Sequence, residues 1–238
     1  MPQPFLSVVI PAFNEEPRIS GTLSQVVDYL AGQDYGWEVV VADDGSTDQT
    51  AELVGQVIVA HPNVRILRLP HRGKGWAVKH GMLAADGRYR LICDADLSVP
   101  IQQVERLLPP LQSGFDIVLG SREASGAVRI GEPVRRHLMG RAFNQLVSRL
   151  AVPGLADTQC GFKCFTGETA QDLFRLLTID GFAFDVELLY LARKRGLRFS
   201  EVGVDWYYRP QSKVRPICDS LAMTLDLLKI RWRHRNPA

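Results

Sequence analysis

The chain has 238 residues, of which 46% are hydrophobic and 23% charged, a composition typical of a soluble globular protein with a real core. Its net charge of +2 gives no global reason to expect nucleic-acid binding. The four cysteines show no paired CxxC spacing, so reduced thiols are expected rather than a zinc site or disulfides. There is no signal-peptide pattern and no run that approaches the roughly 18 apolar residues of a membrane span, which predicts a protein of the cytosol or of a cytosolic membrane surface.

Short apolar runs alternate with segments of helical spacing in the first half of the chain. Strands are predicted at 6–10, 37–42, 65–69, 89–93 and 115–119. Between them, a first helix is predicted at 19–30 and a second helix that ends at about residue 60. A third helix is predicted to run from the glycine loop at 71–75 to residue 85, and a fourth to begin at residue 101. Ser46, with Gln49 three residues on, has the form of a capping box for the second helix. Strands that alternate with helices indicate an α/β fold with a mostly parallel sheet and helices on both faces.

The pattern changes after Gly120. The next elements are expected to be a polar, Gly-rich flexible loop at 121–132, a helix at 133–150, a compact polar-aromatic segment at 157–165, a helix at 184–195, a strand at 198–204 and an amphipathic basic segment at 216–235. We therefore expect one main domain over 1–212, which includes the helix at about 134–150, and a C-terminal amphipathic helix over 213–238.

Two carboxylates with one residue between them, Asp94 and Asp96, follow the apolar run at 89–93. In an open α/β sheet, ligands bind at the carboxyl ends of strands. Two acids at such an end cannot both be ionised cheaply without a cation. Oxygen ligands suit Mg²⁺ or Mn²⁺, shared with substrate phosphates. The alternative is a strand-end turn in which Asp96 caps a helix, and this short motif alone does not decide between them.

Polar clusters also follow the first three strands. The run Pro11-Ala12-Phe13-Asn14-Glu15 offers an aromatic ring and a carboxylate that suit a nucleobase and its sugar, although an exposed turn acid is the simpler interpretation. An acid in Asp43-Asp44-Gly45-Ser46 suits a ribose or a base edge. Gly73-Lys74-Gly75 brings backbone and a cation to a phosphate. The P-loop and GxGxxG spacings are missing, which argues against ATPases and dehydrogenases.

These four clusters should converge, because the carboxyl ends of parallel strands share one edge of a sheet. Acids for base, ribose and metal, together with a lysine, describe a site for a nucleoside diphosphate. The joint pattern is therefore more specific than any one of its motifs.

The ordered motifs, together with Gly120-Ser121-Arg122 and the run DTQCGFK at 157–163, resemble those of family 2 inverting glycosyltransferases, which have the GT-A fold, a Rossmann-like sheet for nucleotide-diphospho-sugars. More narrowly, they are similar to the polyprenyl- and dolichyl-phosphate sugar transferases, and most similar to the dolichyl-phosphate β-glucosyltransferase branch. The resemblance covers roughly residues 5–215.

The resemblance implies roles for single residues. The residues expected to contact the nucleotide-sugar are Pro11, Phe13, Glu15, Asp44, Lys74, Asp94, Ala95, Arg209 and Lys213. The expected metal ligands are Asp94, Asp96 and Ser98, where Ser98 stands at a position that is Gln in the related mannosyl branch. The expected catalytic residues are Asp96, Asp157, Arg122 and Arg136. Arg122 and one of Arg135 and Arg136 would meet phosphates, and Asp157 would orient the acceptor or the sugar.

The expected reaction is transfer of a hexose from a nucleotide-sugar, with UDP-glucose favoured, to a polyprenyl or dolichyl phosphate with inversion, in the presence of Mg²⁺ or Mn²⁺. The alternatives are a GDP-mannose donor, a soluble acceptor, a nucleotidyltransferase that releases pyrophosphate, and a non-enzymatic nucleotide-binding membrane adaptor. The protein is expected to be cytoplasmic and peripheral on the cytosolic face of a membrane. The amphipathic segments at 134–150 and 216–235 would contact the lipid, unless they pack on the domain instead.

Overall fold

The computed structural model describes residues 3–209 and 216–235. The strands are β1 (Leu6–Ala12), β2 (Trp37–Asp43), β3 (Val64–Arg68), β4 (Tyr89–Ile92), β5 (Ile117–Ser121), β6 (Val128–Ile130), β7 (Lys163–Thr166), β8 (Phe199–Gly203) and β9 (Asp205–Tyr207). The helices are α1 (Ile19–Ala31), α2 (Thr50–Ala60), α3 (Lys74–Ala84), a 3-10 turn (Ile101–Gln103), α4 (Val104–Gln112), α5 (Val134–Leu150), α6 (Gly167–Leu176), α7 (Phe184–Lys194) and α8 (Pro216–Arg233).

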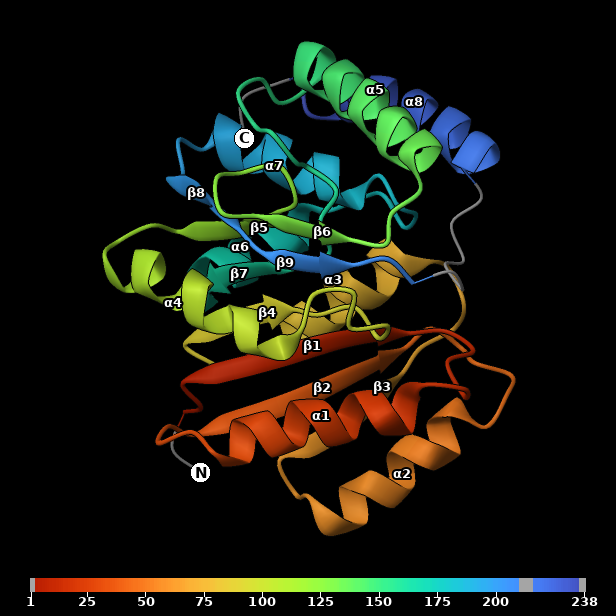
Figure 1. Cartoon of the computed structure of the whole chain (residues 1–238), viewed down its shortest axis with the longest axis vertical. Coiled ribbons are helices and arrows are strands. Elements are labelled where there is room, and N and C mark those ends of the chain that lie inside the picture. Colours follow the sequence, from red (N-terminus) through yellow and green to blue (C-terminus); the bar gives the residue numbers. More distant parts are fainter. Residues whose placement is uncertain (1–2, 210–215, 236–238) are drawn as a thin grey trace.

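Seven strands form one sheet in the order β3-β2-β1-β4-β7-β5-β8. Strand β7 is antiparallel to both of its neighbours, and the other neighbours pair in parallel. The strand order reverses at β1, which pairs with β2 on one side and with β4 on the other. In such sheets, ligands bind beside the reversal, at the carboxyl ends of the strands. The predicted fold class, a mostly parallel sheet with helices on both faces, is confirmed (Figure 1).

The side chains of β1 alternate between two hydrophobic cores, as the period of two in a strand requires. Val8 and Ile10 belong to the core that includes residues of α1, α2 and α4, and Val9 belongs to the core that includes residues of α3, α6 and α7. Both cores are therefore built on the sheet, one on each of its faces.

The local signals of the sequence predict the first helix but not the start of the second. Helix α1 buries its predicted apolar stripe, Ile19, Leu23, Val26, Val27 and Leu30. The capping box predicted at Ser46 is wrong, because α2 begins at Thr50 and Gln49, its N-cap residue, makes no side-chain cap. The hydroxyl of Ser46 instead accepts a hydrogen bond from the backbone N–H of Asn14, at 2.9 Å. Ser46 thus ties the loop after β2 to the loop after β1.

Three strands, β6, β7 and β9, lie where no strand was predicted. The segment at 121–132, expected to be a flexible loop, contains β6, which pairs in parallel with β9. The compact segment at 157–165 leads into β7, which lies between β4 and β5. All three strands are short, and each pairs with a strand distant in sequence, so local patterns do not reveal them.

Helix α8 packs against α5 and α7 at one end of the molecule, where Figure 1 shows α5 and α8 side by side. Met223, Leu227 and Ile230 of α8 are buried in the core that includes α7. The expected division between 1–212 and 213–238 remains a prediction, since that boundary falls outside the described residues. No helix within the described residues is both long enough and apolar enough to cross a bilayer.

Candidate active site

A cavity of about 920 Å³ lies at the carboxyl ends of β1, β2 and β4. Its lining includes every predicted site residue whose side chain the structure describes: Pro11, Phe13, Glu15, Asp44, Lys74, Asp94, Ala95, Asp96, Ser98, Arg122, Asp157 and Arg209. The strand-end clusters thus converge on one cavity, as a parallel sheet predicts. The roles assigned to these residues by the resemblance remain predictions.

Two predicted site residues are not placed at the cavity. Arg136 lies in α5, but its side chain is outside the part of the structure that is described, and Lys213 lies outside the described residues altogether. The neighbouring Arg135 does line the cavity. Which of Arg135 and Arg136 meets a phosphate remains a prediction.

The carboxylate of Asp44 holds the glycine loop that precedes α3. Its oxygens accept hydrogen bonds from the backbone N–H groups of Arg72 (3.0 Å) and Gly73 (2.8 Å), and the Nδ1 atom of His71 lies 2.8 Å from Oδ2. The ring of His71 also stacks on Phe13, with 4.0 Å between the ring centroids and 12° between the planes. Asp44 and His71 thus join the ends of β1 and β2 to the loop that carries Lys74. His71 is not among the site residues predicted from the sequence.

The turn that contains Asp94 and Asp96 has an unusual backbone. Leu97 has a φ of 44°, in the left-handed region, where a bulky residue is an outlier that costs on the order of 1–3 kcal/mol. The N–H of Leu97 donates to the carbonyl of Asp94 (3.1 Å), and the N–H of Ser98 donates to Oδ1 of Asp96 (2.9 Å). The carbonyl of Ser98 accepts from the N–H of Tyr207 (2.7 Å). These bonds hold the backbone of Asp94 and the carboxylate of Asp96 in a strained turn, as is common at functional sites.

Lys74 pairs with Asp94, with 2.7 Å between Nζ and Oδ1. Burial alone would lower the pKa of Lys74, but the carboxylates of Asp94 and Asp185 raise it above its ordinary value, so the ammonium stays charged. Gly161 lies against the other side of Asp94, where a Cβ on residue 161 would come within 2.1 Å of Oδ2. Asp94 thus lies between the ammonium group of Lys74 and the backbone of Gly161, which has no side chain.

A buried ion pair between Lys163 and Asp185 lies next to the Lys74–Asp94 pair. Lys163 in β7 is fully buried, and its Nζ lies 2.6 Å from Oδ1 of Asp185 in the first turn of α7 and donates to the carbonyl of Cys160 at 2.5 Å. Burial raises the pKa of Asp185 even though Lys163 and Lys74 oppose the change. Asp185 lines the cavity. Neither Lys163 nor Asp185 is among the site residues predicted from the sequence.

The carboxylates of Asp94 and Asp96 fit a divalent cation in the chemistry of their donor atoms, since hard cations prefer oxygen ligands. They line the same cavity as Ser98, the third predicted ligand. Within the described ranges, however, no group of three or more His, Cys, Asp or Glu residues could hold a metal ion. Mg²⁺ usually binds through one or two carboxylates together with substrate phosphates, and two acids beside an open cavity suit that mode.

Arg122 and Asp157, which also line the cavity, form a bidentate ion pair. Nε and one terminal nitrogen of Arg122 donate to the two carboxylate oxygens of Asp157, at 2.7 and 2.8 Å. The N–H groups of Arg122 and Gln159 donate to the same carboxylate. Burial alone would raise the pKa of Asp157, but Arg122 holds the pKa of that carboxyl well below its usual range. Asp157 is thus an orienting group for Arg122, and it is a poor proton acceptor.

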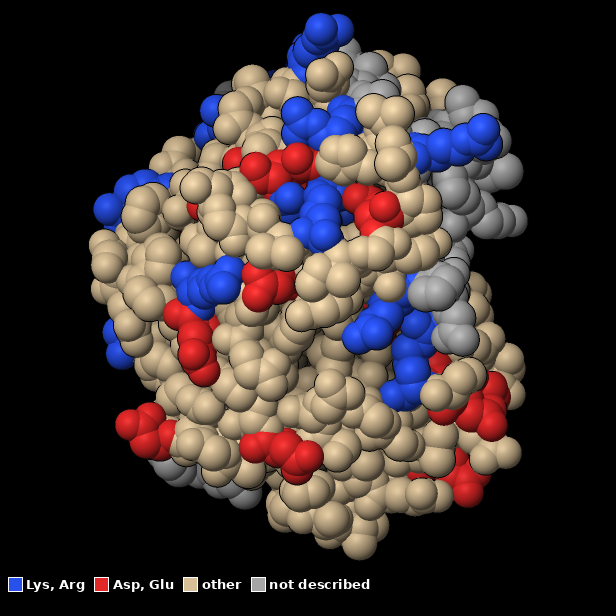
Figure 2. Space-filling model, in the orientation of Figure 1, with Lys and Arg blue, Asp and Glu red and all other residues tan. Residues whose placement is uncertain are grey.

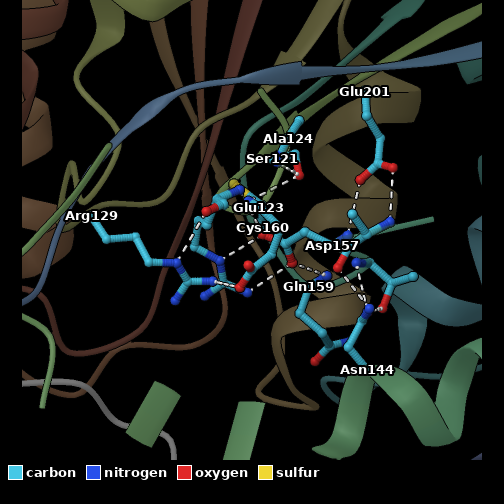
Figure 3. A network of polar contacts seen from close by, with 12 residues as sticks. Ser121, Glu123, Ala124, Arg129, Asn144, Asp157, Gln159, Cys160 and Glu201 are labelled. Carbon is cyan, nitrogen blue, oxygen red and sulfur yellow. Dashed lines mark hydrogen bonds and ion pairs between the residues drawn. The ribbon is translucent and has the colours of Figure 1, made fainter. Parts of the chain in front are cut away.

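The loop that carries Asp157 is fixed from two other elements (Figure 3). Glu201 of β8 accepts hydrogen bonds from the N–H groups of Ala156 (2.8 Å) and Asp157 (2.9 Å). Asn144 of α5 donates to the carbonyl of Ala156 (2.7 Å) and accepts from the N–H of Thr158 (3.1 Å). Because α5 borders the cavity, these bonds connect its position to that of Arg122. No motif in the sequence pointed to Glu201 or Asn144.

A second arginine contacts Arg122. The guanidinium of Arg129 donates to the carbonyl of Arg122 (3.1 Å) and forms ion pairs with Glu123 and Glu132. Glu123 also pairs with Arg141 of α5, at 3.3 Å. All five residues line the cavity, and we call this set the Arg122 wall. Its basic groups are held in place by acidic neighbours.

Comparisons with known proteins identify the family of this chain. Residues 7–167, well over half of the chain, match the family described as Glycosyl transferase family 2. The chain belongs to glycosyltransferase family 2. This family 2 glycosyltransferase is 38% identical to a protein of Dictyostelium discoideum named dolichyl-phosphate beta-glucosyltransferase, over 97% of this chain and 75% of that protein. Human and Drosophila melanogaster proteins of the same name are 36% and 39% identical, each over 96% of this chain and 75% of the relative.

A solved structure supplies the fold of this glycosyltransferase independently. Glucosyl-3-phosphoglycerate synthase from Mycobacterium tuberculosis, in complex with Mn²⁺, UDP and glucosyl-3-phosphoglycerate, aligns with a TM-score of 0.71 at 23% identity, over 99% of this chain and 81% of that one. The likeness confirms the GT-A fold that the sequence predicts. The family assignment also confirms that the chain is an enzyme.

Proposed function

We propose that this glycosyltransferase moves glucose from UDP-glucose to a polyprenyl or dolichyl phosphate and forms a β-linked lipid phosphosugar. The observation that carries the proposal is that one cavity is lined both by the carboxylate pair Asp94 and Asp96 and by the Arg122 wall. The names of the relatives that match nearly the whole chain support the glucosyl group and the dolichyl phosphate.

The donor would lie at the ends of β1, β2 and β4. Phe13 and Asp44, with Pro11 and Glu15 beside them, would contact the nucleoside, and Lys74 would meet the diphosphate. Asp94 and Asp96 would hold Mg²⁺ or Mn²⁺, which when bound supplies positive charge to the diphosphate that leaves. Ser98 is proposed as a further ligand, and Arg209 as a basic residue near the donor, because both line the same cavity.

The acceptor phosphate would lie at the Arg122 wall. A phosphate monoester has a second pKa of about 6, so it is already largely ionised at pH 7. It needs to be positioned and does not need a strong base. Its oxygen bonds to C1 of the sugar from the face opposite the leaving group, while the bond from C1 to the diphosphate breaks and its electron pair stays on the UDP oxygen. This displacement inverts the α-linked donor and gives a β-linked product.

The enzyme is proposed to work as a peripheral protein at a lipid surface. Val134 and Leu138 of α5 and Leu225, Leu228 and Trp232 of α8 are exposed large apolar side chains. Figure 2 shows that Lys and Arg side chains gather over the end of the molecule where Figure 1 places these helices. Exposed apolar groups flanked by basic residues are typical of helices that lie in a membrane interface. The cytosolic face of that membrane remains a prediction from the sequence.

A panel of labelled nucleotide-sugars tests the proposal. The purified chain is incubated with each donor, Mg²⁺ or Mn²⁺, and vesicles with or without dolichyl phosphate, and label is counted in the organic extract. We expect UDP-glucose to label the extract only when dolichyl phosphate is present. Label in the extract from GDP-mannose would show that the proposed donor, UDP-glucose, is wrong. Label that stays in the aqueous phase on an added soluble acceptor would show that the proposed lipid acceptor is wrong.

A further inference from the structure

The side chain of Lys74 lies among carboxylates. Its Nζ is 2.7 Å from Oδ1 of Asp94, and the charges of Asp185 and Asp96 also act on it. Both members of the ion pair are reachable from the cavity, with side-chain exposures of 24% for Lys74 and 31% for Asp94. Lys74 therefore occupies the position of a positive counter-ion beside the two acids that are proposed to hold a divalent metal.

The backbone on both sides of this pair has little room to move. A Cβ on Gly75, the residue after Lys74, would meet the carbonyl oxygen of Ile179 at 2.5 Å, and a Cβ on Gly161 would meet Oδ2 of Asp94 at 2.1 Å. The N–H of Trp76 donates to the carbonyl of Asp180, which fixes the first turn of α3 to the same segment. The backbone beside the Lys74–Asp94 pair is thus closely packed, and its two side chains are the groups that can exchange partners.

The charges around the Lys74–Asp94 pair favour binding of a divalent metal only when a further anionic group, such as a diphosphate, binds as well. Asp94 and Asp96 supply two negative charges, and Lys74 offsets one of them. The described residues offer no third His, Cys, Asp or Glu that completes a ligand set. A nucleoside diphosphate brings further oxygen ligands, and it also offers Lys74 a new anionic partner.

We propose that Lys74 is the resident counter-ion of Asp94 and couples the binding of the divalent metal to the binding of the nucleoside diphosphate. Lys74 competes with the metal for Asp94 when no nucleotide is present, and it turns to the diphosphate when the nucleotide binds. The metal alone therefore binds weakly, and metal and nucleotide strengthen each other. This inference rests on the proposed function for its choice of ligand.

Titration of Mn²⁺ tests the coupling without any measurement of turnover. Free Mn²⁺ is followed by electron paramagnetic resonance for the wild-type chain and for Lys74→Met, each with and without UDP. For the wild type, we expect UDP to tighten Mn²⁺ binding about tenfold, and Mn²⁺ to tighten UDP binding by the same factor, because coupling is reciprocal. For Lys74→Met, we expect tighter binding of Mn²⁺ alone, weaker binding of UDP, and a smaller coupling factor.

Two further variants separate this role from a general effect on charge or folding. Lys79→Met removes a lysine from the same helix, where its Nζ donates to the carbonyl of Leu177, and should leave Mn²⁺ affinity unchanged. Lys74→Arg keeps the positive charge and should keep Mn²⁺ alone weak. Thermal unfolding of each variant verifies that it is folded.

Any one of three results would overturn the inference. Lys74→Met could bind Mn²⁺ alone no more tightly than the wild type does, or Lys79→Met could have the same effect as Lys74→Met. The third such result is a wild-type chain that binds no Mn²⁺ even when UDP is present. Failure of the proposed reaction is distinguishable, since a chain that shows the coupling but labels no lipid in the transfer assay contradicts the acceptor and leaves the role of Lys74 standing.

Discussion

The charge of Asp157 controls the arginine that faces the proposed acceptor. Asp157 is only 3% exposed, and its two oxygens are bound by Arg122. Its pKa in the folded chain lies below the value of about 3.9 of an unfolded aspartate. Folding therefore gains stability from this group above about pH 4, and loses that gain as the pH falls towards the folded-state pKa.

We predict that Asp157→Asn lowers the free energy of unfolding at pH 7 by about 3 kcal/mol, because it leaves the charge of Arg122 unpaired. The deficit relative to the wild type should shrink as the pH falls below about 4. Urea denaturation of both proteins between pH 7 and pH 3 measures it. A deficit that stays constant over that range would show that ionisation of Asp157 is not its cause.

Gly161 is predicted to be essential for the position of Asp94. In Gly161→Ala the new methyl group would overlap the carboxylate, since the Cβ would lie 2.1 Å from Oδ2. We expect kcat/KM for transfer to fall at least about tenfold, because small misplacements of reacting groups have large effects on rate. Gly21→Ala, at a position with no atom within 4 Å of the new Cβ, is the control and should keep full activity. Equal activity of both variants would contradict the described position of Asp94.

At the scale of elements, α8 has two apolar faces with different surroundings. Met223, Leu227 and Ile230 are buried in the core, whereas Leu225, Leu228 and Trp232 are exposed. The alternatives of packing and membrane contact are thus compatible, because one face of the helix packs on the domain and the other remains available to lipid.

We predict that Trp232→Asp weakens binding to vesicles with anionic lipid and lowers activity with a long polyprenyl phosphate. The cause is loss of an apolar side chain that is 72% exposed and its replacement by a charge that anionic lipid repels. Vesicle co-sedimentation and transfer assays measure the two effects. Val59→Asp, at an 88% exposed residue of α2, is the matched control and should change neither.

Activity of Trp232→Asp with a short, water-soluble prenyl phosphate should stay near that of the wild type, because the cavity is not altered. An equal loss with the short acceptor would indicate damage to the site itself. Unchanged vesicle binding would contradict the membrane role of this face.

The end of α8 is held to the domain by a buried carboxylate. Glu187 of α7 lies 2.7 Å from Nε2 of His234 and accepts hydrogen bonds from the N–H and hydroxyl groups of Thr178 and the N–H of Ile179. We predict that Glu187→Gln costs about 1–3 kcal/mol, because an amide NH₂ replaces one acceptor oxygen. Hydrogen exchange should then speed up in α8. The exposed Glu168→Gln on α6 is the control, and unchanged protection of α8 in Glu187→Gln would refute this account of its docking.

At the scale of the whole molecule, the sequence predicted the sheet and the convergence of the site because both depend on strong, simple signals. Apolar runs ending in Pro11, Asp44 and Asp94 mark strands whose carboxyl ends must meet in a parallel sheet. All three residues do line one cavity. The resemblance to a family then extended the prediction to Arg122 and Asp157, which no local pattern connects.

The features of the fold and the site that were not predicted depend on contacts between segments distant in sequence. A single sequence does not show such contacts. The antiparallel insertion of β7, the pairing of β6 with β9 and the stacking of Phe13 on His71 all join residues far apart in the chain. The capping box at Ser46 failed for the same reason, because Asn14 from another loop uses its hydroxyl. Asp185 and Lys163 escaped notice because a buried ion pair leaves no pattern in sequence.

The most direct test of the central claim is transfer of labelled glucose from UDP-glucose to dolichyl phosphate by the wild type, Asp96→Asn and Asp34→Asn, scored as label in the organic extract. Asp34 is an exposed acid remote from the cavity and serves as the control. We predict that the wild type and Asp34→Asn form the lipid product. In Asp96→Asn the rate of transfer should fall at least about 100-fold, because the substitution removes a charge that is proposed to hold the metal. A wild type that leaves the lipid unlabelled, or an Asp96→Asn variant as active as the wild type, would contradict the account.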